Sequence, residues 1–181
     1  MKDLKEFDIS FVGLKEGNHQ FEYVIENKFF EFFKYDDINS SSVKVVLSFL
    51  KKATMFELNF QCAGWVEVAC DVTNELFHQP VQSEIDLIVN FGDEFNDENE
   101  ELLIIPHSEF KINVAQYIYE AIVLSVPIKR IHPGVEDGTL KSDVLEKLRE
   151  LEIKDQEIEE DNIKEIDPRW NKLKEYTNRK K

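Results

Sequence analysis

The feature that most constrains the fold is a long alternation of apolar and polar residues between positions 56 and 70. A period of two places alternate side chains on opposite faces of a strand, so this stretch predicts a β-structure with one buried face. A glycine near its middle predicts a bend or bulge that divides it into two strands. The expected inward row is Phe56, Leu58, Phe60, Cys62, Gly64, Val66, Val68 and Cys70.

Shorter alternations predict four further strands, at residues 7–11, 21–25, 43–49 and 85–91. A loop is expected at 72–80, which makes residues 65–71 and 82–91 an antiparallel pair. The apolar spacing then changes to that of a helix at 113–125, with Asn113 as the candidate N-cap and Pro127 beyond its end. A short second helix is expected to start near Ser142.

These elements predict an α+β fold: a mostly antiparallel bent sheet or partial barrel of about six to seven strands, packed by one main amphipathic helix, with short C-terminal helices. We expect a core domain at 1–138, a short helix at 139–151, an acidic flexible linker at 152–166 and a short basic amphipathic helix at 167–181. The linker combines many charges with few apolar anchors. Asp167 followed by Pro168 is a typical helix start.

Charge is distributed unevenly along the chain, whose formal net charge is −15. Residues 1–125 contain 9 Lys and no Arg against 23 acidic residues, whereas residues 126–181 contain 13 basic and 14 acidic residues. An acidic surface repels phosphates and attracts basic partners. Any RNA contact is therefore expected from the C-terminal third. No targeting or membrane-spanning segment is apparent, which favours a soluble, cytoplasmic protein.

The two cysteines give little support for a disulfide or a metal site. Cys62 and Cys70 lie eight residues apart on one strand face, which corresponds to roughly 26 Å. A disulfide requires Cα atoms within about 7 Å. The four histidines do not form the paired spacing of a zinc site. The acidic stretch 92–101 lacks the glycine and terminal glutamate of a calcium loop, so we interpret it as a solvated loop.

Nothing in the sequence has the pattern of a catalytic motif. A nucleophile elbow, a glycine-rich phosphate loop and a zinc-protease motif are all missing from the sequence. We therefore expect a protein that is not an enzyme, with no cofactor, no metal and no small-molecule substrate. A hydrolase whose site is assembled across the sheet stays open as a rival; a deep pocket with two convergent histidines or carboxylates would favour it.

Three segments in order resemble the YceD family, the large ribosomal RNA subunit accumulation proteins. They are GWVEVACDVTNELFHQPV at 64–81, INVAQYIYEAIVLSVPIK at 112–129 and DPRWNKLKEY at 167–176. Many relatives carry Cys-x-Arg-Cys at the strand end and further cysteines downstream, a pattern similar to a metal ribbon. This chain keeps Cys70 but has Val72 and Thr73 at the next two family positions. The resemblance thus makes Cys70 a remnant without ligand partners.

The resemblance implies a non-enzymatic role in large-subunit rRNA accumulation and ribosome biogenesis. We expect the partner to be a basic ribosomal protein or assembly factor, with rRNA as a possible second partner. The alternative is an acidic adaptor or chaperone for basic proteins without RNA contact. The candidate partner or RNA contacts are Arg130, Arg169, Trp170, Lys172, Leu173 and Lys174. The candidate acidic docking loop comprises Asp93, Glu94, Asp97, Glu98, Glu100 and Glu101.

Overall fold

The structure is a computed structural model that describes residues 4–99 and 101–151. The chain divides into two compact units, Met1–Ser142 and Asp143–Lys181. We call the described part of the first unit the body. The predicted linker at 152–166 and the predicted terminal helix at 167–181 lie outside the described residues.

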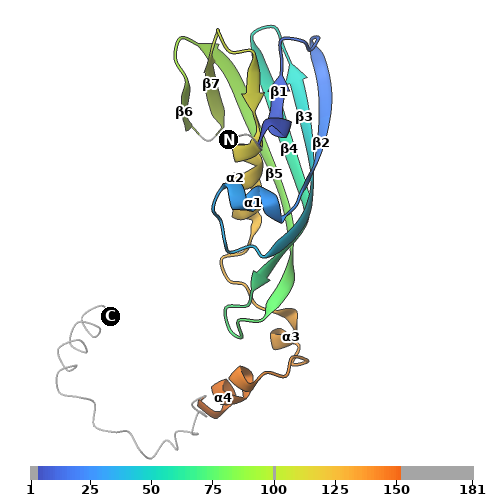
Figure 1. Ribbon diagram of the computed structural model, residues 1–181, viewed down its shortest axis with the longest axis vertical. Coiled ribbons are helices and arrows are strands. Elements are labelled where there is room, and N and C mark those ends of the chain that lie inside the picture. The colour runs from blue at the N-terminus through green and yellow to red at the C-terminus, as the bar shows by residue number, and fades with distance from the viewer. Residues whose placement is uncertain (1–3, 100, 152–181) are drawn as a thin grey trace, which may run out of the picture. The chain divides into compact units, whose positions relative to one another are not determined.

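The body is built on a six-stranded sheet with the order β2-β3-β4-β5-β7-β6 (Figure 1). All neighbours pair antiparallel except β5 and β7, which are parallel. A second, two-stranded sheet pairs β1 with β8. The strands are β1 (Asp8–Ser10), β2 (Gly17–Ile25), β3 (Ser40–Lys51), β4 (Met55–Ala69), β5 (Leu76–Gly92), β6 (Asn96–Asn99), β7 (Leu102–Pro106) and β8 (Lys111–Asn113).

Helices are few and short in the described residues. They are the 3₁₀ turn η1 (Lys5–Phe7), α1 (Asn27–Phe32), α2 (Ala115–Ser125), α3 (Pro133–Glu136) and α4 (Asp143–Leu151). Among residues 4–99 and 101–151, no helix combines the length and the apolarity needed to cross a membrane. The predicted α+β class with a mostly antiparallel sheet is confirmed, and the sheet does not close into a barrel.

The main helix begins two residues later than the sequence predicted. Val114 occupies the N-cap position of α2. Asn113 belongs to β8, but its Oδ1 accepts a hydrogen bond of 3.0 Å from the backbone N–H of Ala115. The side chain thus satisfies one of the N–H groups that a helix start leaves without an intrahelical partner.

The predicted division of the long alternation at Gly64 is wrong. β4 runs without a break from Met55 to Ala69, and its register with β3 and β5 shows no shift. A Cβ atom at Gly64 would lie 2.2 Å from the carbonyl oxygen of Ser42 and 2.7 Å from the Cα of Val43. The glycine therefore allows β3 and β4 to approach closely, rather than marking a bulge.

The predicted pairing after β4 is also wrong. Residues 65–69 pair with 76–80, whereas residues 82–90 pair with 55–63. The chain turns at 70–75, earlier than expected, so β4 and β5 form one long hairpin. The acidic stretch 92–101 is not entirely loop, because it contains β6, and two further strands, β7 and β8, precede α2.

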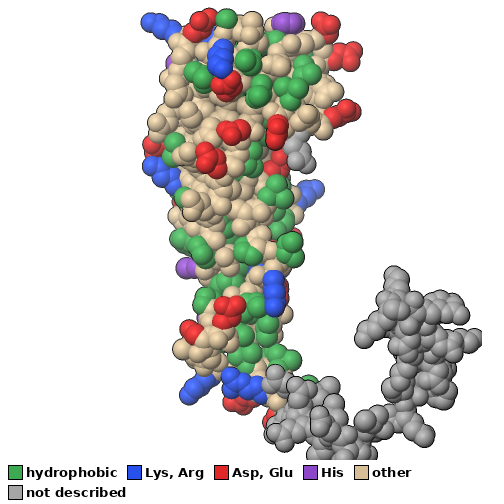
Figure 2. Space-filling view, turned by 180° about the vertical axis from the view of Figure 1, so that it is seen from behind, with side chains coloured by type: hydrophobic (Ala, Val, Ile, Leu, Met, Phe, Trp, Pro, Cys, Tyr) green, Lys and Arg blue, Asp and Glu red, His purple; other side chains and the backbone are tan. Residues whose placement is uncertain are grey.

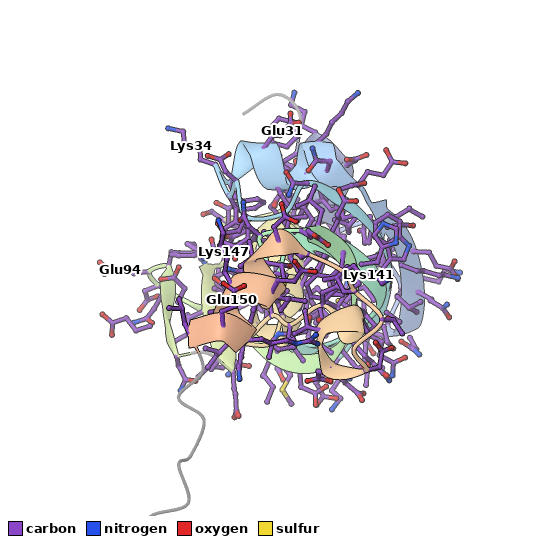
Figure 3. All side chains as sticks on the ribbon, turned by 90° about the horizontal axis from the view of Figure 1, so that it is seen from below. Glu31, Lys34, Glu94, Lys141, Lys147 and Glu150 are labelled. Atoms are coloured by element: carbon purple, nitrogen blue, oxygen red, sulfur yellow. The ribbon has the colours of Figure 1, made fainter. Side chains whose placement is uncertain are left out.

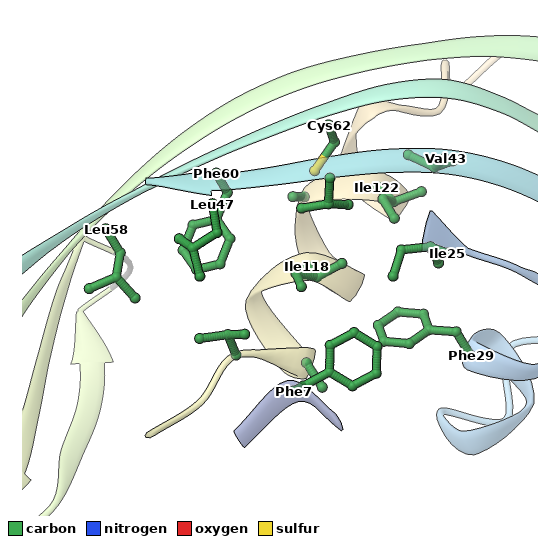
Figure 4. Close-up of a cluster of buried hydrophobic side chains, with 14 of the residues drawn as sticks. Phe7, Ile25, Phe29, Val43, Leu47, Leu58, Phe60, Cys62, Ile118 and Ile122 are labelled. Atoms are coloured by element: carbon green, nitrogen blue, oxygen red, sulfur yellow. The ribbon is translucent and has the colours of Figure 1, made fainter. Parts of the chain in front are cut away.

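The core lies between the inner face of the sheet and a layer formed by α1, α2 and β1. In Figure 4, Leu47, Phe60 and Val43 of the sheet face Ile118 and Ile122 of α2. Phe7 and Phe29 close the layer from the opposite side, with ring centroids 5.1 Å apart. Burial of these side chains fixes which face of each strand is left for solvent and partners.

Candidate functional site

A groove with acidic walls lies in the body between β5, the β6–β7 hairpin and α2. Its volume is about 640 Å³. Five of its lining residues carry carboxylates and none is Lys, Arg or His. We call it the acidic groove. Its lining residues are Glu84, Ile85, Asp86, Asp97, Asn99, Glu101, Leu103, Gln116, Tyr117, Glu120 and Leu124.

Alternation along β5 explains two of the carboxylates. Ile85 and Leu87 turn toward the core side, so Glu84 and Asp86 lie on the exposed face of the same strand. The amide of Asn59, on the neighbouring strand β4, donates to Glu84 Oε1 and to Asp86 Oδ1, each over 2.8 Å. These two acids are therefore held side by side by one amide donor.

The opposite wall is provided by α2. Gln116 and Glu120 are one helical turn apart, and the amide of Gln116 donates to Glu120 Oε1 over 2.9 Å. Tyr117 is half-buried between this wall and the floor of the groove. Burial, followed by the negative charges of Asp97 and Glu120, raises the pKa of the Tyr117 hydroxyl to about 12. The five carboxylates of the lining disfavour binding of a further anion in the groove.

Apolar side chains form the remaining surface of the acidic groove. Leu124 is 79% exposed at its edge, and Leu103 is buried in its floor. A second hollow of about 570 Å³ adjoins the groove and shares Asp97, Leu103, Gln116 and Tyr117 with it. Its lining includes Phe95, which is 59% exposed. A ligand here would contact both negative charges and apolar surface.

The structure brings together only part of the predicted acidic loop. Asp97 and Glu101 line the acidic groove, whereas Asp93, Glu94 and Glu98 are not among its lining residues. Glu94 projects outward from the body (Figure 3). Glu100 lies outside the described residues. Acidic side chains are also spread over the upper half of the face seen in Figure 2, so negative charge is not confined to one loop.

Sequence reasoning missed three carboxylates of the acidic groove, Glu84, Asp86 and Glu120. The exposed positions of the alternation at 82–91 and of the helical pattern at 113–125 could have identified them as surface acids. Their proximity to Asp97 could not be predicted, because it depends on how three elements distant in sequence pack together.

Arg130 is the one predicted basic contact within the described residues. Its guanidinium lies 3.5 Å from carboxylate oxygens of both Asp37 and Asp71, and its side chain is 25% exposed. Its backbone pairs with Asp71 as well: the Asp71 N–H donates to the Arg130 carbonyl over 2.8 Å, and the Arg130 N–H donates to Asp71 Oδ2 over 2.7 Å. Arg130 thus joins the β4–β5 turn to the segment after α2.

The Cys70 thiol lies beside this contact and is 2% exposed. Burial opposes its ionisation, but hydrogen bonds from Thr73 and from the backbone N–H groups of His132, Thr73 and Val72 outweigh this effect and lower its pKa. His132 contacts the sulfur through its backbone N–H, and its ring Nδ1 accepts a hydrogen bond from Gly134 N–H over 2.9 Å.

A cysteine-bound metal does not fit this strand end. Zinc requires about four ligands, and Thr73 stands where the second cysteine would be. Within residues 4–99 and 101–151, no group of three or more His, Cys, Asp or Glu side chains could hold a metal ion. Both cysteines are free thiols.

The histidines are also placed apart from the acidic groove. His78 stacks on Trp65 with ring centroids 4.0 Å apart, and His107 stacks on Phe91 at 5.7 Å. In the described part of the chain, neither these two nor His19 and His132 line the groove. The convergent side chains of the groove are therefore carboxylates, and none of these four histidines is placed to act with them.

The remaining predicted contacts, Arg169, Trp170, Lys172, Leu173 and Lys174, lie outside the described residues.

Comparison with known proteins identifies one family. The family model described as "Large ribosomal RNA subunit accumulation protein YceD" matches residues 58–175, which include most of β4 and all of β5, the acidic groove and α2. No match was found among curated proteins or among solved structures. The match covers well over half of the chain, and the chain therefore belongs to the YceD family of large ribosomal RNA subunit accumulation proteins.

Proposed function

We propose that this protein supports accumulation of the large-subunit rRNA by binding a basic ribosomal protein or assembly factor in the acidic groove, without catalysing a reaction. The observation that carries the proposal is the composition of the groove: five carboxylates, no cationic side chain and exposed Leu124 at the edge. Such a surface complements a segment rich in Lys or Arg with interspersed apolar residues. The proposed location is the cytoplasm.

The proposal assigns RNA contact to the C-terminal segment rather than to the body. Residues 1–125 contain 23 acidic residues against 9 Lys, and such a surface repels a phosphate backbone. The proposed RNA contacts are Arg169, Trp170, Lys172, Leu173 and Lys174. Arg130 is omitted, because its guanidinium already faces Asp37 and Asp71.

The test of protein binding uses the full chain and the proteins extracted from purified large ribosomal subunits. A groove variant combines Glu84→Gln, Asp97→Asn and Glu120→Gln. A control variant combines Asp93→Asn, Glu94→Gln and Glu98→Gln, which removes the same charge away from the groove lining. We expect a discrete set of basic proteins to bind the wild type and the control, and about tenfold weaker binding by the groove variant. Equal loss in both variants would show nonspecific charge attraction instead.

The test of RNA contact uses full-length protein carrying Arg169→Gln, Lys172→Gln and Lys174→Gln. We expect this variant to lose salt-sensitive binding to large-subunit rRNA while keeping its basic protein partner. Unchanged RNA affinity would contradict the assigned division between body and C-terminal segment. Absence of RNA binding by the wild type, with partner capture unaffected by nuclease, would favour the alternative of an acidic adaptor for basic proteins.

A further inference from the structure

One edge of β5 has no neighbouring strand over most of its length. β5 spans Leu76–Gly92, and β4 pairs with residues 76–90 on one side. On the other side, β7 pairs only with residues 88–92. Among the described residues, no strand pairs with positions 76–87 on this second side. We call positions 81–87 of this side the free edge.

The ladder geometry shows which backbone groups face the free edge. The Ile88 N–H donates to the Glu101 carbonyl over 2.9 Å, at the side where β7 begins. Backbone groups of every second strand residue point the same way. The N–H and C=O groups of Gln82, Glu84 and Asp86 therefore point to the free edge, and within the described residues none of them has a backbone partner there.

The free edge opens onto the acidic groove. Glu84 and Asp86 line the groove from β5 itself, Glu120 lines it from α2, and Glu101 lines it immediately before β7. A strand added at the free edge would continue the line of β7. Its side chains would alternate between the exposed face, near Glu84 and Asp86, and the side of α2.

We propose that the partner binds through an extended basic segment that pairs with the free edge of β5 as an added strand; this rests on the proposed function of the acidic groove. About seven residues, or roughly 23 Å of strand, would fit beside positions 81–87. Main-chain hydrogen bonds to Gln82, Glu84 and Asp86 supply affinity, and alternate cationic side chains supply specificity.

Charge decides between a basic segment and a second copy of this chain as the occupant. Two copies paired through this edge would bring Glu84 and Asp86 of one copy near those of the other, and like charges directly opposite each other destabilise a strand pair. Pro80, which has no N–H, ends the run of exposed donors on one side. The edge is thus protected against self-association and open to a cationic strand.

The experiment measures binding of a synthetic ten-residue peptide of alternating Lys and Val to the full chain. A second peptide of identical sequence carries N-methyl groups on all central amides. It keeps its charge, but its central amides cannot donate main-chain hydrogen bonds to a neighbouring strand. On the protein, Gln82→Pro removes one donor of the free edge, and Gln82→Ala keeps it. Both retain net charge, and Pro80 shows that this edge of the strand accepts proline.

We expect Gln82→Pro and N-methylation each to weaken binding at least tenfold, and Gln82→Ala to leave it within about twofold. In the wild type, the peptide should slow amide exchange at Gln82, Glu84 and Asp86 at least tenfold. This measurement does not depend on how well the proline variant folds.

Two outcomes would overturn the inference. If the N-methylated peptide binds as tightly as the parent and exchange at the three amides is unchanged, strand addition is wrong. In that case, weaker binding by the groove variant would leave the proposed function standing. If neither the parent peptide nor the large-subunit proteins bind the wild type, the proposed function fails together with the inference.

Discussion

The backbone N–H of His132 donates a hydrogen bond to the sulfur of Cys70 over 3.3 Å and so connects residues 62 positions apart. The contact fastens the segment after α2 to the end of β4. The sulfur is satisfied by N–H donors and by Thr73. The local structure is therefore held by hydrogen bonds and packing.

We predict that Cys70→Ala lowers the free energy of unfolding by about 1 to 2 kcal/mol, because a buried side chain and a hydrogen-bond acceptor are lost. Partner binding should be unchanged. Urea unfolding and the binding assay with large-subunit proteins check the two statements. Stoichiometric zinc in the purified wild type, lost in the variant, would refute the interpretation of the site as metal-free.

We also predict that the contribution of Cys70 to stability depends on pH. The pKa of Cys70 is lowered from 9.0 in the folded state, so its contribution is complete above pH 9 and is lost as pH falls through the folded pKa. The stability difference between wild type and Cys70→Ala should therefore grow as pH rises toward 9. Cys62 is the control: burial raises its pKa, so its contribution decreases at alkaline pH. If the stability difference from wild type changes with pH in the same way for Cys70→Ala and for Cys62→Ala, the assignment of the two pKa shifts is contradicted.

Arg130→Gln is predicted to lower the free energy of unfolding by about 0.5 to 1 kcal/mol. The two ion pairs at 3.5 Å involve partly exposed carboxylates, so solvent weakens them. The backbone hydrogen bonds with Asp71 persist in the variant. Binding of rRNA should not change, and filter binding at several salt concentrations would measure this. A decrease in RNA affinity without loss of stability would restore Arg130 to the list of RNA contacts.

Gly64→Ala is predicted to lower the free energy of unfolding by about 2 to 4 kcal/mol. The new Cβ would meet backbone atoms of β3 at 2.2 and 2.7 Å, and a backbone cannot move aside as a flexible side chain can. Gly13→Ala is the matched control, since nothing lies within 4 Å of its added Cβ. Thermal unfolding of the two variants compares them, and similar melting temperatures would show that β3 and β4 separate easily.

We predict that acid lowers the stability of the protein through Asp8, which lies in the β1–β8 pair. Hydrogen bonds from Lys111 and then Asn113 lower the pKa of Asp8. Its contribution to stability is therefore present above the ordinary pKa of 3.8 and is lost as pH falls through the folded value. Asp8→Asn should reduce stability at pH 7 by about 0.5 kcal/mol. The difference from wild type should vanish in strong acid, and chemical unfolding between pH 2 and pH 7, at about one-unit steps, would detect it.

Strong periodicity was sufficient to predict α2 and the buried face of β4, but not that β4 continues through Gly64. Alternation identifies the buried face of a strand, but it contains no information on where the chain turns. The predicted pairing of residues 65–71 with 82–91 is wrong for this reason. β7 and β8 are short, at 102–106 and 111–113, and three to five residues give too little pattern.

The acidic groove was partly predictable. The loop residues Asp97 and Glu101 stood out as a run of like charge, whereas Glu120 belongs to an ordinary exposed helix face. The free edge of β5 has no sequence signature at all. It results from a difference in length between two paired strands, which only the three-dimensional structure can reveal.

The pairing of β1 with β8 has a consequence for the order of folding during synthesis. β2, β3, β4 and β5 follow one another along the chain as an antiparallel meander, so their pairing needs only residues up to 92. Ile9, in contrast, pairs with Ile112, and Asp8 pairs with Asn113. Of the strands that the structure describes, β1 leaves the ribosome first, and it must wait, unpaired, until about a hundred further residues have been added.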